Sequence, residues 1–264
     1  MMETIQNKSN KSFNYYWRLF ATGLSFTVFG LGGIVLGIIF FPILLMIPNK
    51  KICRKIARSA IQKCFFFFIE FMRMMGVLSY QTQGFDKLKQ RRGLLIISNH
   101  PTLLDVVFLI AFLDDVDCII KKEIFKNPVM MGVVRAAGYI ANDAQNPEEL
   151  IMNCVDRLSN QTNLIIFPEG TRTQTGRGYQ LQRGASNIAL RAQSPIVPIL
   201  ICCTPPTLRK GERWYNIPPQ KMHFSLSVQS DFPVLNYSDS NAGIAARQLT
   251  IDLTRYFSER LPNE

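Results

Sequence analysis

Two short polar segments contain the residue types that acid–base chemistry needs. The first segment, SNHPTLLD at residues 98–105, follows the apolar residues 94–97. Imidazole takes up and releases protons near neutral pH, so His100 is a candidate general base. A carboxylate that accepts a hydrogen bond from one ring nitrogen leaves the other nitrogen free as the base. Asp105 is the candidate for this orienting role.

The spacing between His100 and Asp105 limits how they can meet, because residues five apart on a continuous helix do not share a face. Pro101 offers a solution, since proline fits the first helical turn and pushes the preceding residue out of the α region. We therefore expect His100 on a turn before a helix that begins at Thr102, with Asp105 inside the first helical turns. A non-functional alternative gives the same pattern: a surface histidine, and an aspartate that is favoured at the start of a helix by the helix dipole.

The second segment, FPEGTR at residues 167–172, also follows an apolar run. Arg172 carries a planar guanidinium fork that suits phosphate. Gly170 allows a ligand to approach the backbone closely, and the Glu169 carboxylate can accept hydrogen bonds from substrate hydroxyls. Taken alone, this segment is better explained as a polar surface turn with a Glu–Arg pair.

Together the two segments resemble the glycerolipid acyltransferase family, which includes the 1-acyl-glycerol-3-phosphate acyltransferases. The family pattern is a histidine, four residues and an aspartate, followed further along the chain by a Phe-Pro-Glu-Gly-Thr-Arg block. Weaker family blocks occur in the same order at residues 121–124 (with Pro128, Gly132 and Gly138), 183–185 and 195–199. The resemblance runs from about Tyr80 to Cys202.

The resemblance implies a role for each residue of the two motifs. His100 is the general base for an acceptor hydroxyl, and Asp105 orients it. The acceptor-binding residues are Lys121, Glu169, Gly170, Thr171 and Arg172. The arginine and the lysine would hold a phosphate, and the others would position the glycerol part. The donor is an acyl thioester on coenzyme A or acyl-carrier protein, and neither a metal nor a bound cofactor is implied.

The expected acceptor is 1-acyl-glycerol-3-phosphate, which would give phosphatidic acid. One departure leaves the acceptor open: Ala144 follows Asp143, where the family often has arginine. An acyltransferase or transacylase that acts on another lyso-lipid or a glycolipid is therefore an alternative. A non-catalytic membrane lipid-binding protein is an alternative of a different class, although such a protein needs neither His100 nor Asp105.

The pattern of apolar runs and helical periodicity predicts an α/β domain over residues 79–264, with a mostly parallel sheet flanked by helices. The predicted strands are Leu94–Ser98, Cys118–Lys121, Gly138–Ala141, Leu164–Phe167, Ile196–Cys202 and His223–Gln229. The predicted helices are Thr102–Phe112, Pro128–Ala136, Glu148–Leu158, Gly184–Ala192 and Ala242–Leu261.

The N-terminal part predicts attachment to a membrane. Residues 1–18 form a polar tail, and residues 19–49 contain no charged side chain. This apolar segment exceeds the roughly 20 residues that a membrane-spanning helix needs, and it is longer than the apolar part of a signal peptide, about 7–15 residues. We expect it to be membrane-embedded. Its glycines and Pro42 leave open whether it spans the bilayer or re-enters on the same side.

Residues 50–78 are predicted to be an amphipathic helix in the headgroup zone of the bilayer. Its apolar stripe is Ile52, Ile56, Ala60, Cys64, Phe68, Phe71 and Met75. The polar residues Lys51, Arg54, Lys55, Arg58, Gln62 and Arg73 lie largely opposite. A core helix of the globular domain is the alternative.

The charge of the chain, +11 at neutral pH, favours an anionic partner, and the apolar N-terminus favours anionic lipid over nucleic acid. The heavier basic flank follows the apolar segment, which predicts that the α/β domain lies in the cytoplasm. We expect the membrane to be the inner membrane of a bacterium. The six cysteines lack CxxC spacing and are expected to be reduced. With two histidines in the chain, a zinc site is not expected.

Overall fold

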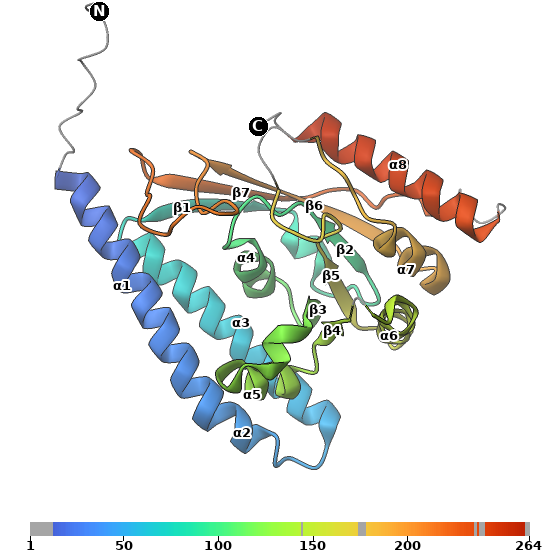
Figure 1. Ribbon diagram of the computed structural model, residues 1–264, viewed down its shortest axis with the longest axis horizontal. Helices are drawn as coiled ribbons and strands as arrows, with labels where there is room; N and C mark the ends of the chain where they lie inside the picture. Colours follow the sequence, from blue (N-terminus) through green and yellow to red (C-terminus); the bar gives the residue numbers. More distant parts are fainter. Residues whose placement is uncertain (1–12, 144, 174–177, 235–236, 238–240, 262–264) are drawn as a thin grey trace, which may run out of the picture.

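The computed structural model describes residues 13–143, 145–173, 178–234, 237 and 241–261, which form a seven-stranded sheet with helices on both faces (Figure 1). The strands are β1 (Leu78–Gln83), β2 (Leu95–Ser98), β3 (Val116–Lys121), β4 (Ile140–Asn142), β5 (Asn163–Ile166), β6 (Ile196–Thr204) and β7 (Met222–Val228). The helices are α1 (Phe13–Val35), α2 (Phe41–Leu44), α3 (Lys50–Met74), α4 (Asp105–Phe112), α5 (Pro128–Ala137), α6 (Pro147–Ser159), α7 (Gly184–Ala192) and α8 (Ala242–Arg260).

The strand order is β1-β7-β6-β2-β5-β3-β4. Neighbouring strands run parallel except β6 and β7, which are antiparallel. The prediction of a mostly parallel α/β sheet is therefore confirmed. Strand β1 was not predicted, because its sequence LSYQTQ is mainly polar and its strand conformation comes from pairing with β7.

The central strands are buried on both faces, as expected for a parallel sheet covered by helices. All four residues of β2 are buried, and so are all four of β5. Leu95 and Ile97 point into a cluster with α6, α7 and α8. Ile96 points into the opposite cluster, which contains residues of α1 and α3 to α5. The carboxyl ends of these strands are thereby held rigidly from two sides.

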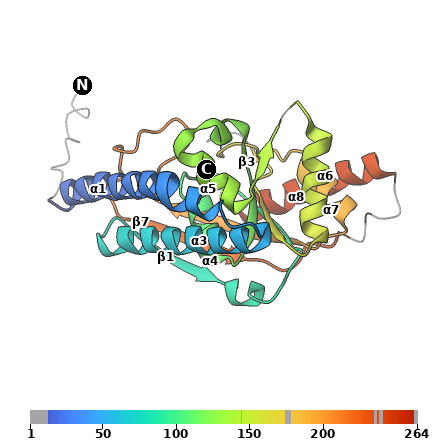
Figure 2. The same cartoon turned by 90° about the horizontal axis from the view of Figure 1, so that it is seen from below.

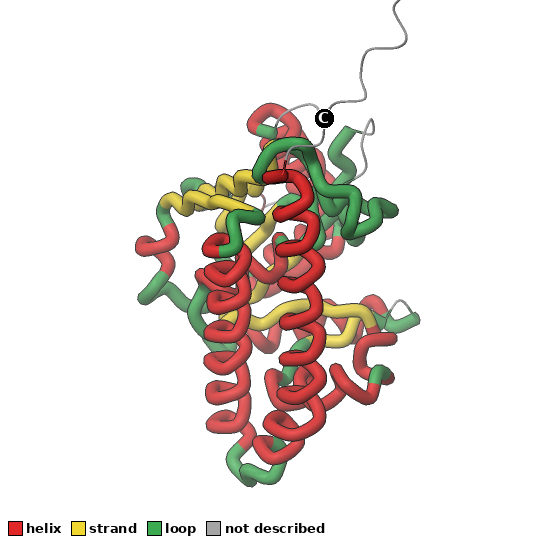
Figure 3. Tube along the Cα trace, turned by 90° about the vertical axis from the view of Figure 1, so that its left-hand side faces the viewer, coloured by secondary structure: helices red, strands yellow, loops and turns green. Residues whose placement is uncertain are grey.

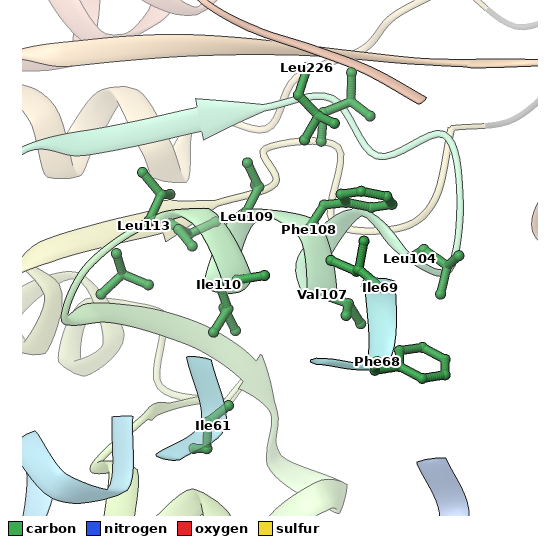
Figure 4. Packing of buried hydrophobic residues seen from close by; sticks show 14 of the residues in the cluster. Ile61, Phe68, Ile69, Leu104, Val107, Phe108, Leu109, Ile110, Leu113 and Leu226 are labelled. Atoms are coloured by element: carbon green, nitrogen blue, oxygen red, sulfur yellow. The ribbon is translucent and has the colours of Figure 1, made fainter. Parts of the chain in front are cut away.

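Helix α4 lies between the sheet and α3 (Figure 4). Phe108 is fully buried and packs on Phe224 of β7, with ring centroids 4.6 Å apart. The helix begins at Asp105, three residues after the predicted start. Pro101 precedes the helix, and residues 102–104 form a turn. The predicted helix start at Thr102 is thus wrong, whereas Asp105 does lie in the first helical turn.

The N-terminal segment forms a helical hairpin. Helix α1 continues through a π-helical turn (Leu36–Phe40) into α2, and α3 then runs back beside α1 (Figures 2 and 3). Helix α1 begins at Phe13, so residues 13–18 of the predicted polar tail are helical, and residues 1–12 lie outside the described part. Among the described residues, one helical segment, Phe13–Leu44, is long and apolar enough to cross a membrane, with a mean hydropathy of 2.3.

Close backbone contact holds the tip of this hairpin to α5. A Cβ at Gly37 would lie 2.1 Å from the Val129 carbonyl oxygen, and one at Gly132 would lie 2.7 Å from the Gly37 oxygen. At the other end of α1, the buried Arg18 side chain donates to the Pro218 carbonyl at 3.0 Å. Both ends of the apolar segment therefore contact the α/β domain.

Helix α3 begins after Asn49, whose side chain accepts hydrogen bonds from the amides of Lys51 and Ile52. One face of the helix is a core face, formed by Cys53, Ala57, Arg58, Ile61, Phe68, Ile69 and Met72. Ile52 and Ile56 of the predicted apolar stripe are exposed instead. The predicted polar position of Arg58 is wrong, because its guanidinium is buried and pairs with Asp117 at 2.8 Å.

Candidate active site

The topology brings the two polar segments to one edge of the sheet. β2 leads to His100 and β5 leads to the FPEGTR segment, and these strands are parallel neighbours with Ile97 opposite Ile166. Ligands of open α/β sheets bind outside the carboxyl ends of the strands. The segments that the sequence singled out therefore meet where a site is expected.

His100 and Asp105 form the predicted pair. The Nδ1 atom of His100 lies 2.8 Å from Oδ2 of Asp105. The imidazole is partly exposed, whereas the carboxylate is fully buried. Among the described residues, Nε2 of His100 has no hydrogen-bond partner, which leaves it available to a substrate. The geometry suits a base that is oriented through Nδ1 and acts through Nε2.

Thr102 holds the Asp105 carboxylate in place, a contact that the sequence analysis did not identify. Its amide donates to Oδ2 at 2.6 Å and its hydroxyl donates to Oδ1 at 2.6 Å, while the same hydroxyl accepts from the Leu104 amide. Burial raises the pKa of Asp105, and the hydrogen bonds from His100 and Thr102 oppose that rise. A Thr-x-x-Asp step before an apolar run is a capping-box signal, so these contacts were open to prediction.

Asn99 fixes the turn that carries His100. Its buried side chain donates to the Ile201 carbonyl at 2.7 Å and accepts from the Ile201 amide at 2.9 Å. These two bonds extend the ladder between β2 and β6 by one residue. Since they join residues 102 positions apart in the chain, no local sequence pattern indicated them.

Glu169 ties the second segment to the first. Its Oε1 atom accepts a hydrogen bond from the His100 amide at 3.0 Å and another from the Thr173 hydroxyl at 2.9 Å. The Thr173 amide in turn donates to the His100 carbonyl at 2.8 Å. Burial raises the pKa of Glu169, and these hydrogen bonds oppose it. The carboxylate that was expected to bind acceptor hydroxyls thus uses one oxygen to hold the backbone at His100.

Phe167 stacks on the imidazole, with ring centroids 4.3 Å apart and an angle of 26° between the planes. The residue follows β5 directly and begins the FPEGTR motif, but no role was predicted for its side chain. Stacking on one face restricts the rotation of the His100 ring. It thereby helps keep Nδ1 directed at Asp105.

Gly170 is required by its backbone conformation, with φ of +69°. L-residues other than glycine rarely adopt this left-handed region. In addition, a Cβ at this position would lie 2.5 Å from Nε2 of Gln182. The turn that carries residues 168–172 is therefore shaped for glycine.

Arg172 is half-buried, and Nη1 donates to the carbonyl oxygens of Leu208 and Arg209, each at 3.0 Å. Within the described residues, its Nε and Nη2 atoms make no hydrogen bond to the protein. Part of the guanidinium fork is thus used structurally, and the rest can reach a ligand. Thr171 is partly exposed in the same turn.

Lys121 ends β3, which pairs with β5, so it lies at the same sheet edge as the two motifs. The side chain is exposed, and the described residues offer no hydrogen bond or ion pair to it. Its expected role as a second cation stays a prediction. Ala144 lies outside the described residues.

The fold and this site define an α/β protein with an oriented histidine at the carboxyl edge of a parallel sheet. Residues 79–202, just under half of the chain, match the acyltransferase family model. Over these residues the chain is similar to the acyltransferase family.

The chain is also similar to named acyltransferases. A 1-acyl-sn-glycerol-3-phosphate acyltransferase from Limnanthes douglasii is 33% identical over 135 residues, which are 49% of this chain and 47% of that protein. One from Helicobacter pylori is 31% identical over 150 residues, which are 55% of this chain and 60% of the relative. The matches thus span about half the length of these relatives.

A solved structure supports the fold. The crystal structure of the 1-acyl-sn-glycerophosphate (LPA) acyltransferase PlsC from Thermotoga maritima superposes with a TM-score of 0.70. The match covers 95% of this chain and 100% of that chain, at 18% sequence identity. The N-terminal hairpin and the α/β domain therefore both lie within the shared architecture.

Proposed function

We propose that this protein transfers a fatty acyl group from a thioester donor to the free hydroxyl of a lysophospholipid. The 2.8 Å contact between His100 and Asp105, which leaves Nε2 open to a substrate, is the observation that carries the proposal. The acyltransferase domain and the names of the relatives support the same reaction.

In the proposed mechanism, Nε2 of His100 takes the proton of the acceptor hydroxyl as its oxygen attacks the thioester carbonyl. Asp105 accepts the Nδ1–H bond, which fixes the tautomer and stabilises the imidazolium that forms. When the tetrahedral intermediate collapses, the C–S bond breaks and the imidazolium returns its proton to the thiolate. The protein needs no nucleophile of its own. The nearby Ser98 is buried, and its hydroxyl donates to the Asn99 carbonyl.

The proposed acceptor is 1-acyl-glycerol-3-phosphate, which would yield phosphatidic acid. Arg172 supports this choice, because Nε and Nη2 remain for a phosphate group that matches the planar fork. Lys121 supplies a further positive charge at the same sheet edge. The acyl donor would be acyl-CoA or acyl-carrier protein.

The proposed setting is the surface of a membrane that contains anionic lipid, with the α/β domain on the cytoplasmic side of a bacterial inner membrane. The apolar hairpin supports membrane association. Contacts at both ends of α1 with the α/β domain favour a helix that lies along the membrane surface over one that crosses it. This placement would give the lipid acceptor and the diacyl product a short path between the bilayer and the active site.

The test is an assay of the purified full chain with labelled acyl-CoA or acyl-carrier protein and a panel of lyso-lipids, with chromatographic separation of the products. The proposal predicts a diacyl product that depends on both substrates, with lysophosphatidic acid preferred among the acceptors. Preference for a lysophospholipid with a large headgroup would overturn the acceptor assignment. Absence of acyl transfer with every donor and acceptor would overturn the activity.

A further inference from the structure

The segment between β6 and β7 contacts both motifs of the site. The carbonyl oxygen of Leu208 accepts hydrogen bonds from the Leu103 amide at 3.1 Å and from Nη1 of Arg172 at 3.0 Å. Leu208 is buried and has a positive φ of 54°, which turns the chain at this point. One carbonyl group thus joins the turn after His100 to the arginine of the second motif.

The same segment contacts α1, some 190 residues earlier in the chain. The buried Arg18 side chain donates from Nη1 to the Pro218 carbonyl at 3.0 Å and from Nη2 to the Pro219 carbonyl. Trp214 packs its ring against Gly23, where a Cβ would lie 3.3 Å away, and against the Phe26 ring at 6.4 Å. Burial of a guanidinium group is unfavourable unless its N–H groups are hydrogen-bonded. The hydrogen bonds of Arg18 to the two carbonyls therefore anchor this segment to α1.

We propose that residues 205–219, here named the strap, position Arg172 for the acceptor and are themselves positioned by α1. The inference rests on the proposed function, because it assigns Arg172 to the acceptor. Arg18 and Trp214 act as positioning residues at the helix end of the strap, and the Leu208 carbonyl acts at the site end. The orientation of the acceptor-binding arginine then depends on how the N-terminal hairpin packs on the domain.

The hydrogen bonds of Arg172 explain how the strap would orient its side chain. Nη1 of Arg172 has two N–H groups, and the carbonyls of Leu208 and Arg209 accept both. Because guanidinium is planar, fixing one nitrogen in this way also fixes the directions of Nε and Nη2. If the strap shifts, the arginine keeps its charge but loses its fixed plane, and a phosphate would meet a less ordered partner.

The first test measures steady-state kinetics for Trp214→Ala and Arg18→Met. We expect the KM for lysophosphatidic acid to rise about 2- to 12-fold, which is the change in affinity that corresponds to the loss of one net hydrogen bond. The KM for the acyl donor should stay unchanged. Trp214→Phe keeps an aromatic ring against Gly23 and Phe26 and should restore most of the acceptor affinity. Lys210→Ala removes an exposed positive charge from the strap without touching either anchor and should match the wild type.

A double-mutant cycle separates positioning from a general loss of structure. In an Arg172→Ala background the strap substitutions should have no further effect on the acceptor KM, because they act through that arginine. Equal rises in acceptor KM with and without Arg172 would overturn the proposal. So would equal rises in donor and acceptor KM.

A further measurement does not depend on activity. Hydrogen exchange of the Leu103 amide, which donates to Leu208, should be faster in Trp214→Ala than in wild type at equal global stability. Arg18→Met replaces Trp214→Ala if the latter does not fold. Unchanged exchange at Leu103 in the folded variant would overturn the strap proposal. Absence of wild-type turnover with normal exchange behaviour would instead overturn only the proposed function.

Discussion

The His100–Asp105 pair depends on the side chain of Thr102 as well as on its own two members. Asp105 is fully buried and accepts hydrogen bonds from His100, from the Thr102 amide and from the Thr102 hydroxyl. Burial of a carboxylate is unfavourable unless such bonds compensate it. The threonine thus helps keep the acidic partner in the orientation that the histidine needs.

We expect Asp105→Asn to lower acyl transfer by about 10²–10⁴-fold, because the amide no longer sets the imidazole tautomer reliably. Thr102→Val keeps the carboxylate and the amide contact but removes the hydroxyl bond to Asp105. It should lower the free energy of unfolding by about 1.5–3 kcal/mol, the value of a hydrogen bond to a charged group, with a smaller effect on turnover. Denaturant unfolding and kcat of both variants give the comparison. A larger loss of turnover in Thr102→Val than in Asp105→Asn would contradict this order of roles.

At the scale of elements, the turn after β5 is held in a conformation that favours glycine. Gly170→Ala should destabilise the protein by about 1–2 kcal/mol because an L-residue with a side chain disfavours φ near +69°. The new methyl group would also displace Gln182. Gly184→Ala, where a Cβ meets open space at the start of α7, is the matched control and should not destabilise. Equal thermal stability of Gly170→Ala and wild type would contradict the structure of the turn.

A buried ion pair joins α3 to the sheet. Arg58 contacts Asp117 at 2.8 Å, and both side chains are buried. Removal of Arg58 leaves Asp117 buried without its closest charged partner, so Arg58→Met should cost about 3–5 kcal/mol of unfolding free energy at neutral pH. Arg157, 3.6 Å from the same carboxylate, should keep the loss near the lower value.

The pH dependence of this loss has a defined sign. Burial raises the pKa of Asp117 above its usual value of 3.8, and Arg58 and Arg157 oppose the rise. Without Arg58 the folded-state pKa rises further. A carboxyl group whose pKa is higher in the folded than in the unfolded state makes the folded protein less stable as the pH rises. The loss occurs between the unfolded-state pKa and the folded-state pKa. Urea unfolding of Arg58→Met and wild type should therefore give a small difference at acid pH that grows toward neutral pH. A difference that shrinks as the pH rises would contradict the assignment.

Strands and helices with clear apolar patterns could be predicted from the sequence, and the edges and contacts of the fold could not. The runs at residues 94–97 and 164–167 are apolar throughout, and each lies largely within a buried central strand. Strand β1 is mostly polar and depends on β7, and the buried face of α3 includes Arg58, which an amphipathic pattern assigns to solvent.

The candidate site shows the same division. His100, Asp105 and the FPEGTR segment were recognisable because residue type and local spacing carry their chemistry. The Asn99 pairing with β6 and the Leu208 contact with Arg172 join residues far apart in sequence, so they became visible only with the fold. The role of Glu169 in holding the His100 backbone depends on the meeting of two loops for the same reason.

At the scale of the whole molecule, exposed apolar side chains run along α1, from Phe13 and Phe20 to the tip of the N-terminal hairpin. Ile38, Ile39 and Ile43 are each more than half exposed, and Met46 is 79% exposed. Burial of a large apolar side chain in a membrane contributes about 1.5–3 kcal/mol. We therefore expect the tip, together with the exposed side of α1, to contact the bilayer.

The double variant Ile39→Asn, Ile43→Asn should reduce binding to vesicles that contain anionic phospholipid by at least about tenfold. Ile244→Asn, Ile251→Asn alters two exposed isoleucines of α8 and serves as the matched control. Vesicle flotation after a high-salt wash compares the two. Equal loss of binding in both double variants would show that the hairpin tip is not the membrane contact.

The most direct test of the account compares acyl transfer to lysophosphatidic acid by wild type, His100→Ala and His223→Ala at equal amounts of folded protein. The chain has two histidines, and His223 forms a polar pair with Ser79 between β7 and β1. The account predicts that His100→Ala stays folded and loses about 10²–10⁴-fold in kcat. His223→Ala should retain wild-type turnover. Normal turnover by His100→Ala would contradict general-base catalysis by this residue and with it the proposed mechanism.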